Sequence, residues 1–350
     1  MPLDELLFHT SEWLKGEGPN ADIVISTRIR LARNVNLEAF PHWANEQQAK
    51  NIVDKIFLAA KSMSVFDGAL FFDLAKLDNI DKQFLIERHL MSHEHALRTE
   101  SKALIVDPGE VYSVMINEED HLRIQVMKSG FDLESAYRII DGIDNGFSQK
   151  LNFAFSKNWG YLTACPTNTG TGMRGSVMMH LAGLVMLQQV NKVLQAIGKL
   201  GFTARGLYGE GTQATGNFFQ ISNQYSLGRN EHEIIDNIFG VVQQIIEQEQ
   251  LARQSLVKNH KLMLEDRIGR SLGVLKSAYL ITSQETVEHL SIVRLGMDLG
   301  LIKDVNTKAI NDLFILIQPS HLQKIEKRKL SSEERDQKRA QLIRDSLIKK

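Results

Sequence analysis

A glycine-rich stretch, residues 165–177 (CPTNTGTGMRGSV), carries residue types that bind phosphate. Gly170, Gly172 and Gly175 follow the spacing G-x-G-x-x-G, and Arg174 lies inside it. Glycines let backbone N–H groups approach an anion, and a guanidinium can bind a phosphate through two hydrogen bonds. The stretch therefore indicates phosphate chemistry, although an ordinary loop with a solvated arginine would have the same sequence.

Two common nucleotide motifs do not fit this stretch. A dinucleotide site needs a βαβ unit and an acid about 20 residues after the glycines to bind the ribose. Residues 190–200 contain no acid, and the segments before the glycines predict antiparallel strands. A Walker loop requires G-K-[ST], which is absent. The phosphate chemistry must be of another kind.

Four further arginines have a spacing that suits a phosphate site. Arg28 and Arg30 share the polar face of a strand expected at 21–34, and Arg123 has the same place in the strand expected at 121–127. Arg205 lies in the glycine-punctuated segment 204–211. Each arginine alone fits a solvated sheet face. Together with the loop arginine, and with no evident acid on the same face, they predict a polyphosphate cradle, because guanidiniums stay charged and present a planar fork.

Three other reactive side chains lie close to these segments. Glu119 is in the tight turn NEED, and Glu210 ends the segment GLYGE. Turn acids are usually only solvated, so composition alone assigns them no role. Cys165 is the only cysteine, which excludes an internal disulfide and fits a reducing, cytoplasmic setting.

The surrounding pattern predicts an α+β fold with a largely antiparallel sheet flanked by helices. Three apolar segments follow one another too closely for crossover connections, so they form hairpins. We expect strands at 21–34, 102–107, 111–117, 121–127 and 216–224, and helices at 45–63, 176–201 and 231–256. The helix at 176–201 would begin near Ser176 and place the loop arginine at a helix N-terminus, which favours anions.

After about residue 230 the strand patterns stop and helices fill the remaining chain. We therefore expect a catalytic domain at 1–250 and an all-α C-terminal domain at 251–350. The segments TSQE at 282 and SSEE at 331 have capping-box spacing.

Bulk composition narrows the class of protein. The 350 residues are 43% hydrophobic and 24% charged, with a formal net charge of -1. This charge gives no general attraction for nucleic acid or an anionic membrane. We find no signal peptide and no apolar run of membrane-spanning length, and we expect a soluble cytoplasmic protein.

Four segments, in order, resemble the signature segments of the ATP:guanido phosphotransferases, or phosphagen kinases. They are STRIRLARN, NEEDHLRI, CPTNTGTGMRGSV and ARGLYGEG, and the likeness covers about residues 20 to 250. Within this superfamily the chain is similar to the bacterial protein arginine kinases, which phosphorylate arginine side chains in proteins.

The resemblance implies a role for each matching residue. ATP, carrying Mg2+, would be bound by residues of five segments, and no protein-held metal is implied. These residues are Ser26, Thr27, Arg28, Ile29, Arg30, His89, Arg123, Arg174, Gly175, Ser176, Val177, Met178, Arg205, Gly206, Leu207, Tyr208 and Gly209. Glu119 and Glu210 would clamp the acceptor guanidinium, with Cys165 beside it. His89 is a short match, and a packing histidine fits nearly as well; histidines 89, 93 and 95 lack the order H-E-x-x-H expected of a zinc site.

Two departures from the phosphagen kinases bear on the substrate. Only about twenty residues precede the STRIR segment, where kinases of free guanidines have a helical domain that encloses the small substrate. An acceptor pocket without that cover would suit a protein-borne arginine. The superfamily histidine one turn beyond the loop arginine is replaced by Met178, which leaves that nucleotide contact open.

Residues 335–340 (RDQKRA) resemble the motif by which protein arginine kinases bind phosphoarginine allosterically. Arg335, Asp336, Arg339 and Ala340 would form this site, whereas the pattern alone fits a solvated charged helix. The resemblance also implies a homodimer, a zinc-containing activator protein and a role in marking proteins for a Clp-type protease under stress. A kinase of free arginine and an inactive phosphoarginine-binding adaptor are the alternative functions.

Overall fold

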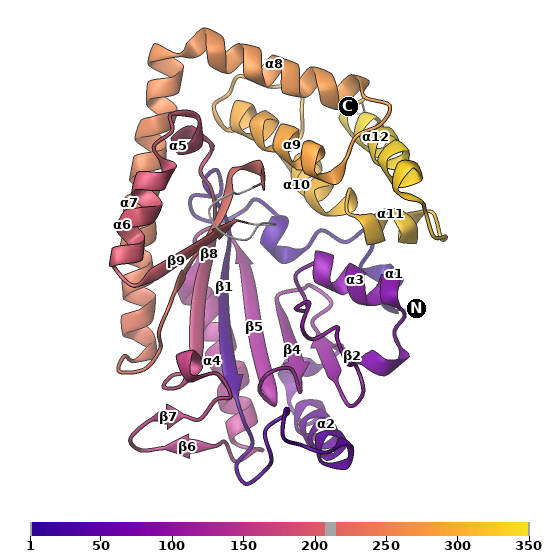
Figure 1. Cartoon of the computed structure of the whole chain (residues 1–350), viewed down its shortest axis with the longest axis vertical. Coiled ribbons are helices and arrows are strands. Elements are labelled where there is room, and N and C mark those ends of the chain that lie inside the picture. Colours follow the sequence, from indigo (N-terminus) through magenta and orange to yellow (C-terminus); the bar gives the residue numbers. More distant parts are fainter. Residues whose placement is uncertain (1, 207–214, 349–350) are drawn as a thin grey trace.

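The computed structural model describes residues 2–206 and 215–348. Its centre is an eight-stranded sheet with the order β2-β3-β4-β5-β1-β8-β10-β9, in which every neighbouring pair is antiparallel (Figure 1). The strands of this sheet are β1 (Val24–Arg33), β2 (Leu70–Asp73), β3 (Ala103–Val106), β4 (Tyr112–Ile116), β5 (Leu122–Ser129), β8 (Met173–His180), β9 (Phe202–Gly206) and β10 (Phe218–Asn223). The predicted antiparallel sheet and its hairpins β3–β4–β5 are confirmed.

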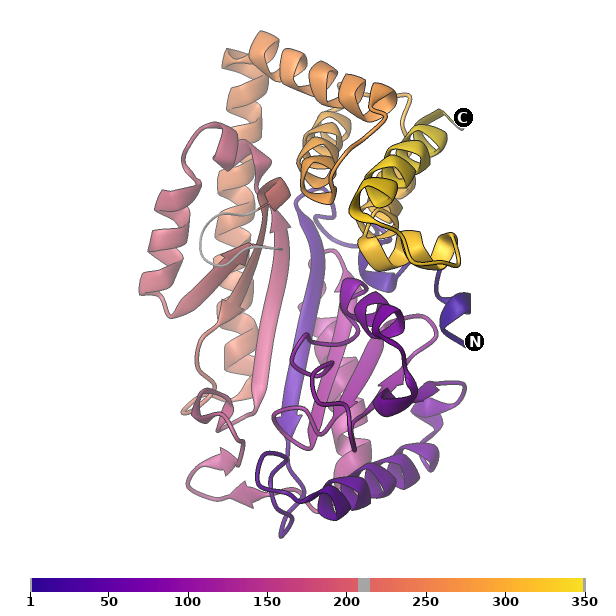
Figure 2. The ribbon, with the colours of Figure 1, turned by 45° about the vertical axis from the view of Figure 1, so that its right-hand side comes forward.

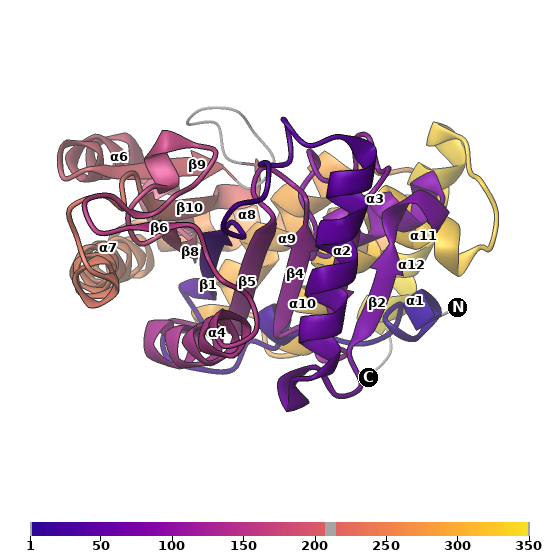
Figure 3. The same ribbon diagram turned by 90° about the horizontal axis from the view of Figure 1, so that it is seen from below.

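Helices surround the sheet. They are α1 (Pro2–Glu5), α2 (Glu46–Lys61), α3 (Asn79–Glu87), α4 (Leu133–Ser148), α5 (Ala182–Met186), α6 (Val190–Lys199), α7 (Glu231–Asn259), α8 (Lys261–Ser277), α9 (Ser283–Asp298), α10 (Thr307–Leu316), α11 (Pro319–Ile325) and α12 (Ser332–Ile348). A two-stranded hairpin, β6 (Phe155–Ser156) with β7 (Gly160–Tyr161), lies with α2 at the lower end of the sheet (Figure 3).

The two faces of the sheet have different covers. On one face, apolar side chains of β1 such as Ile29 and Leu31 pack in one cluster with α2, α4, α6 and α7. Because side chains alternate along a strand, Arg28 and Arg30 of β1 must point to the other face. A second cluster, built from the N-terminal residues, α3 and the C-terminal helices, covers only part of that other face. The remainder is open for a site.

The predicted helix at 176–201 is wrong over its first part. Residues 173–180 form β8, which pairs with β1 on one side and β10 on the other, and helix begins only at Ala182. The positive φ of Gln188 then separates α5 from α6. The apolar run Val177–Met179 fits both periods, and the pairing partners on each side decide for strand. Arg174 therefore lies within a strand, and no helix N-terminus contributes to its environment.

The C-terminal region is helical, as predicted (Figures 1 and 2). Helix α7 begins with a capping box between Asn230 and Glu233 and continues through residue 250 to Asn259. Ser331 and Glu334 form the predicted capping box of α12. At α9 only half of the predicted box is present, in which the Thr282 hydroxyl accepts a hydrogen bond from the N–H of Glu285. Within residues 2–206 and 215–348, no helix has the length and apolar character needed to span a membrane.

Candidate active site

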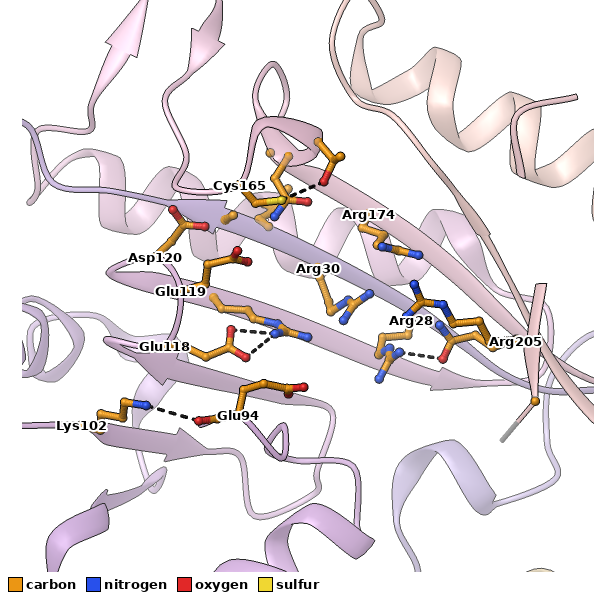
Figure 4. Close-up of a pocket in the computed structure, with 18 residues that line it drawn as sticks. Arg28, Arg30, Glu94, Lys102, Glu118, Glu119, Asp120, Cys165, Arg174 and Arg205 are labelled. Atoms are coloured by element: carbon orange, nitrogen blue, oxygen red, sulfur yellow. Dashed lines mark hydrogen bonds and ion pairs between the residues drawn. The ribbon is translucent and has the colours of Figure 1, made fainter. Parts of the chain in front are cut away.

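All five arginines predicted to bind phosphate line one cavity of about 660 Å³ on the open face of the sheet. They come from β1, β5, β8 and β9, and Figure 4 shows the labelled ones side by side at one end of the cavity. The strand register explains part of this grouping, because Arg30 lies directly opposite Arg174 in the β1–β8 pair. Like charges opposite one another destabilise a sheet, so the arrangement indicates a site that binds negative charge.

The arginine cluster is electrostatically unfavourable in the absence of an anion. Burial, followed by Arg123 and Arg174, lowers the pKa of Arg28 to about 10. Burial, followed by the charges of Arg28, Arg123 and Arg174, lowers the pKa of Arg30 well below its ordinary value. The side chain of Arg30 has no hydrogen-bond partner among the described residues, and its buried Nε is unpaired. A polyanion in the cavity would supply the missing bonds and neutralise the repulsion.

Side chains of β10 hold two of the arginines in place. Arg28 donates from Nη2 to Gln220 Oε1 at 2.8 Å, and Arg174 donates from Nη2 to Ser222 Oγ at 2.9 Å. Both acceptors lie on β10, so this strand orients the cradle. Neither acceptor could be identified from the sequence, because the β10 pattern predicts only a strand.

The expectation that no acid lies beside these arginines is wrong for Arg123. Its Nη1 donates to Glu118 Oε2 at 2.6 Å, and Ser92 donates to the same carboxylate. Glu118 precedes Glu119 in the turn before β5. Its side chain reaches Arg123, five residues further along the chain. Burial acts to raise the pKa of Glu118, but the charge of Arg123 and its hydrogen bonds outweigh burial. The pKa of Glu118 is therefore lowered.

A smaller cavity of about 190 Å³ continues from the arginine cradle and shares Arg28, Gly206 and Gln220 with it. Its other walls include four residues of the predicted nucleotide site or its surroundings: Ser26, His89, Ser176 and Met178. Trp13 also lines it, and its ring packs edge-on against His89 with centroids 5.0 Å apart. Burial and Arg28 lower the pKa of His89 to about 4, so this imidazole is neutral at physiological pH.

Four other residues of the predicted nucleotide site face the opposite side of the sheet. Thr27 is buried and donates to the carbonyl of Gly130, while Ile29 and Val177 belong to the apolar core. A Cβ at Gly175 would lie 2.4 Å from Ile238 of α7. The period-two alternation of strands separates these residues from their cavity-lining neighbours, and only their backbones face the site.

Two of the three residues predicted to contact the acceptor guanidinium, Glu119 and Cys165, lie at the other end of the main cavity (Figure 4). Glu119 and Cys165 both line the cavity, with Asp120 between the turn and the loop that carries the cysteine. Partial burial, followed by Asp120 and Glu118, raises the pKa of Glu119. Glu210, together with Leu207, Tyr208 and Gly209, lies outside the described residues.

Asp120 fixes the turn against the cysteine loop. Its Oδ1 accepts from Asn34 Nδ2 at 2.6 Å and from the N–H of Ala164 at 2.7 Å. Asn34 Oδ1 in turn accepts from the N–H of His121 at 2.9 Å. These bonds connect the end of β1, the turn with Glu119 and the residue before Cys165, so the acceptor groups have a defined geometry.

The loop glycines allow the backbone of this loop to pack closely against neighbouring backbone. Gly172 has φ +66°, and a Cβ there would lie 2.6 Å from the carbonyl oxygen of Ala32. Gly170 has φ +115° and lies against the backbone of Leu227. The glycine spacing thus reflects close packing of the loop on β1 and on residues 226–227. The thiol of Cys165, half-buried, lies 3.0 Å from Thr167 Oγ1.

Comparison with known proteins assigns this arrangement to a family. Residues 49–252 match the family model described as "ATP:guanido phosphotransferase, C-terminal catalytic domain", and residues 261–350 match "Protein-arginine kinase McsB C-terminal domain". Proteins named protein-arginine kinase from Halothermothrix orenii and Brevibacillus brevis are 45% and 46% identical over 96% of this chain, and the matches cover 96% and 95% of those proteins. The chain belongs to the protein-arginine kinase branch of the ATP:guanido phosphotransferases.

Solved structures of this superfamily share the fold. A duplicated taurocyamine kinase from Schistosoma mansoni, with bound components of a transition-state analogue, is 28% identical with a TM-score of 0.59, and the match covers 67% of this chain and 34% of that one. Lombricine kinase has the same TM-score at 23% identity over 69% of this chain and 71% of its own, which indicates a common fold. As a kinase of this family, the protein uses ATP.

Two of the described carboxylates near the arginine cradle already have partners. Among the residues that the structure describes, no group of three or more His, Cys, Asp or Glu side chains is placed to hold a metal ion. Glu118 is paired with Arg123, and Asp120 already accepts two hydrogen bonds. The donor set therefore fits a Mg2+ ion that is bound mainly by nucleotide phosphates.

The C-terminal motif of the kinase lies on α12. Arg339 is 1% exposed and donates from Nε to the carbonyl of Ile317 and from Nη1 to that of Ile281, both at 2.8 Å. Asp336 accepts from the same guanidinium, and Ala340 is buried in the second apolar cluster. Arg335 donates to the carbonyl of Leu330 at 3.0 Å. In this structure the motif holds α12 against the segments before α9 and α11.

Proposed function

We propose that this protein transfers the γ-phosphate of ATP to arginine side chains of other proteins. The arginine cradle carries the proposal, because several desolvated, mutually repelling guanidiniums form a stable arrangement only around a polyanion. The relatives that match this chain over nearly its whole length are named protein-arginine kinases, which supports a protein as the acceptor.

ATP would bind with its phosphates in the cradle and its nucleoside toward the smaller cavity. Arg28 lines both cavities, so it would contact the phosphates closest to the nucleoside. The neutral ring of His89 and the indole of Trp13 offer flat apolar surfaces there. Mg2+ bound to the phosphates would add charge neutralisation. Phosphoryl transfer requires chiefly such neutralisation and an in-line approach.

The acceptor arginine would enter beside Glu119. A guanidinium has a pKa above about 12 and no free lone pair, so it attacks phosphorus poorly unless it is oriented and deprotonated. The carboxylate of Glu119, with that of Glu210 as its proposed partner, would hold the N–H groups and accept one proton. A nitrogen–phosphorus bond forms, the bond from the γ-phosphorus to its bridging oxygen breaks, and ADP leaves. Cys165 would contact the far side of the guanidinium.

Several wider roles belong to the same proposal. We propose a catalytic domain at 1–250 and a helical domain at 251–350 that forms a homodimer and binds phosphoarginine through Arg335, Asp336, Arg339 and Ala340. We also propose that the protein is cytoplasmic, that it acts with a zinc-containing activator, and that a Clp-type protease receives the proteins it marks. Membership of the protein-arginine kinases is the support for each of them.

The test is mass spectrometry of a basic acceptor protein after incubation with enzyme, ATP and Mg2+, with acid avoided because phosphoarginine is acid-labile. We expect phosphate on arginines with the wild type, and a loss of about 10²–10⁴-fold in kcat for Glu119→Gln with an unchanged fold. Free arginine is assayed in parallel. Efficient use of free arginine, or undiminished transfer by Glu119→Gln, would contradict the proposal.

A further inference from the structure

We propose that a groove beside the acceptor carboxylates binds the polypeptide that flanks the target arginine, with Trp43 as its apolar contact. The inference rests on the proposed function, since it concerns the protein that carries the arginine. We call this groove the flank groove; it encloses about 430 Å³ and is lined by Pro41, His42, Arg98, Glu100, Lys102 and Glu118, among others.

The flank groove is continuous with the active-site cavity. Lys102 and Glu118 line both of them. His42, on the groove wall, is close enough to the turn with Glu119 to oppose slightly the rise in the pKa of both Glu119 and Asp120. An arginine whose guanidinium is held by Glu119 can therefore place its backbone near the entrance of the groove, with its sequence neighbours on this part of the surface.

The loop at residues 36–44 contributes Pro41, His42 and Ala44 to one edge of the groove, and it presents two large apolar side chains to solvent. Trp43 is 81% exposed and Leu37 is 97% exposed. The Trp43 indole is next to the ring of His42, with centroids 6.5 Å apart. Exposed apolar side chains at the border of a polar groove are typical of sites that bind another protein, and tryptophan is the residue most often dominant there.

This loop is held in one conformation, which makes it a suitable binding surface. His121 Nε2 contacts the carbonyl of Ala39 at 2.9 Å, and the ring of Phe40 packs edge-on against the same imidazole. The N–H of Trp43 donates to the carbonyl of Phe40 at 2.8 Å. Since His121 is two residues from Glu119, the loop and the acceptor carboxylate belong to one connected unit. A rigid surface loses less conformational entropy when it binds a peptide.

The charges of the groove favour a polypeptide over a nucleic acid or a lipid surface. Its walls carry Glu100 and Glu118 as well as Arg98 and Lys102, so it has no excess of positive charge. Mixed charges with one apolar edge suit an extended chain of mixed sequence. We therefore commit to the segment adjoining the acceptor arginine as the occupant.

The experiment compares Trp43→Ala with wild type on two acceptors at saturating ATP. N-acetyl-arginine amide has no neighbouring residues, whereas a short peptide with a central arginine between leucines can reach the groove. We expect kcat/KM for the peptide to fall about tenfold, as for loss of a well-packed aromatic contact, with kcat/KM for the blocked arginine unchanged. Because the indole is exposed, the melting temperature should not change. Leu262→Ala, an equally exposed apolar side chain on α8, is the matched control and should change neither acceptor.

Equal losses on both acceptors would assign Trp43 a role in the loop's structure and overturn the inference. No change with the peptide would overturn it as well, while leaving the proposed function intact. Failure of the wild type to phosphorylate either acceptor would overturn the proposed function itself.

Discussion

Replacing Arg30 by methionine should make the free protein more stable and the enzyme nearly inactive. The guanidinium of Arg30 is desolvated and is repelled by Arg28, Arg123 and Arg174. Among the described residues this side chain has no hydrogen-bond partner. Methionine keeps the length of the side chain without its charge. The free energy of unfolding should therefore rise, because the substitution removes an unfavourable charge and leaves no partner without a bond.

Arg28 gives the scale of this effect. Its pKa falls from the ordinary value of an arginine to about 10 for the same reasons, and at about 1.4 kcal/mol per pKa unit the charged form costs about 3 kcal/mol. Water in the open cavity screens the repulsion, so we expect about 1–2 kcal/mol for Arg30→Met. Because the folded-state pKa lies below the unfolded one, this cost is present in full at neutral pH. The melting temperature without nucleotide should rise by about 1–3 °C.

Nucleotide should cancel this gain in stability. At an ATP concentration of about 100 Kd, binding stabilises the wild type by about 2.7 kcal/mol. Loss of one charged phosphate ligand weakens binding about 10–100-fold, which reduces this stabilisation to about 0.4–1.4 kcal/mol. The rate of arginine phosphorylation should fall about 10²–10³-fold.

The assay is thermal unfolding with and without Mg-ATP, paired with a phosphoarginine measurement. Arg267→Met, at an exposed position of α8, is the control and should lie within about 0.5 kcal/mol of wild type with full activity. A melting temperature of Arg30→Met below that of wild type in the absence of nucleotide would refute the electrostatic reasoning. An undiminished response to ATP would refute the role of Arg30 in the cradle.

Three further outcomes follow from the contacts. Asp120→Asn keeps the hydrogen-bond acceptor but removes a charge that raises the pKa of Glu119. The acid limb of the pH profile of kcat/KM should therefore move to lower pH. An unchanged limb would show that the limb does not report the titration of Glu119. Gly172→Ala, at φ +66° and against a carbonyl oxygen, should lower the free energy of unfolding by about 2–4 kcal/mol in urea titrations. Arg339→Ala should cost about 2–4 kcal/mol in the same titrations because two buried carbonyls lose their donor, whereas Arg335→Ala should cost less than about 1 kcal/mol; equal effects would contradict the structural role of Arg339.

Much of the fold and of the cradle could be predicted from local patterns. Alternation placed Arg28 and Arg30 on one face of a strand, and short gaps predicted the hairpins β3–β4–β5. The same alternation applied further along β1 puts Arg33 on the core side, where it pairs with Asp144 of α4 at 2.8 Å. Side-chain direction within a strand is a local property, so the sequence is sufficient for it.

The sequence by itself determined which side chains could do this chemistry and which face of each strand they occupy. Tertiary structure alone decided that residues 173–180 are a strand, because their partners β1 and β10 lie far away along the chain. It also decided which arginines have partners: Arg28 is held by Gln220, 192 residues later, Arg123 is held by Glu118, and Arg30 is left for a ligand. Local pattern fixes direction, whereas pairing and charge compensation depend on what the rest of the chain brings to the same place.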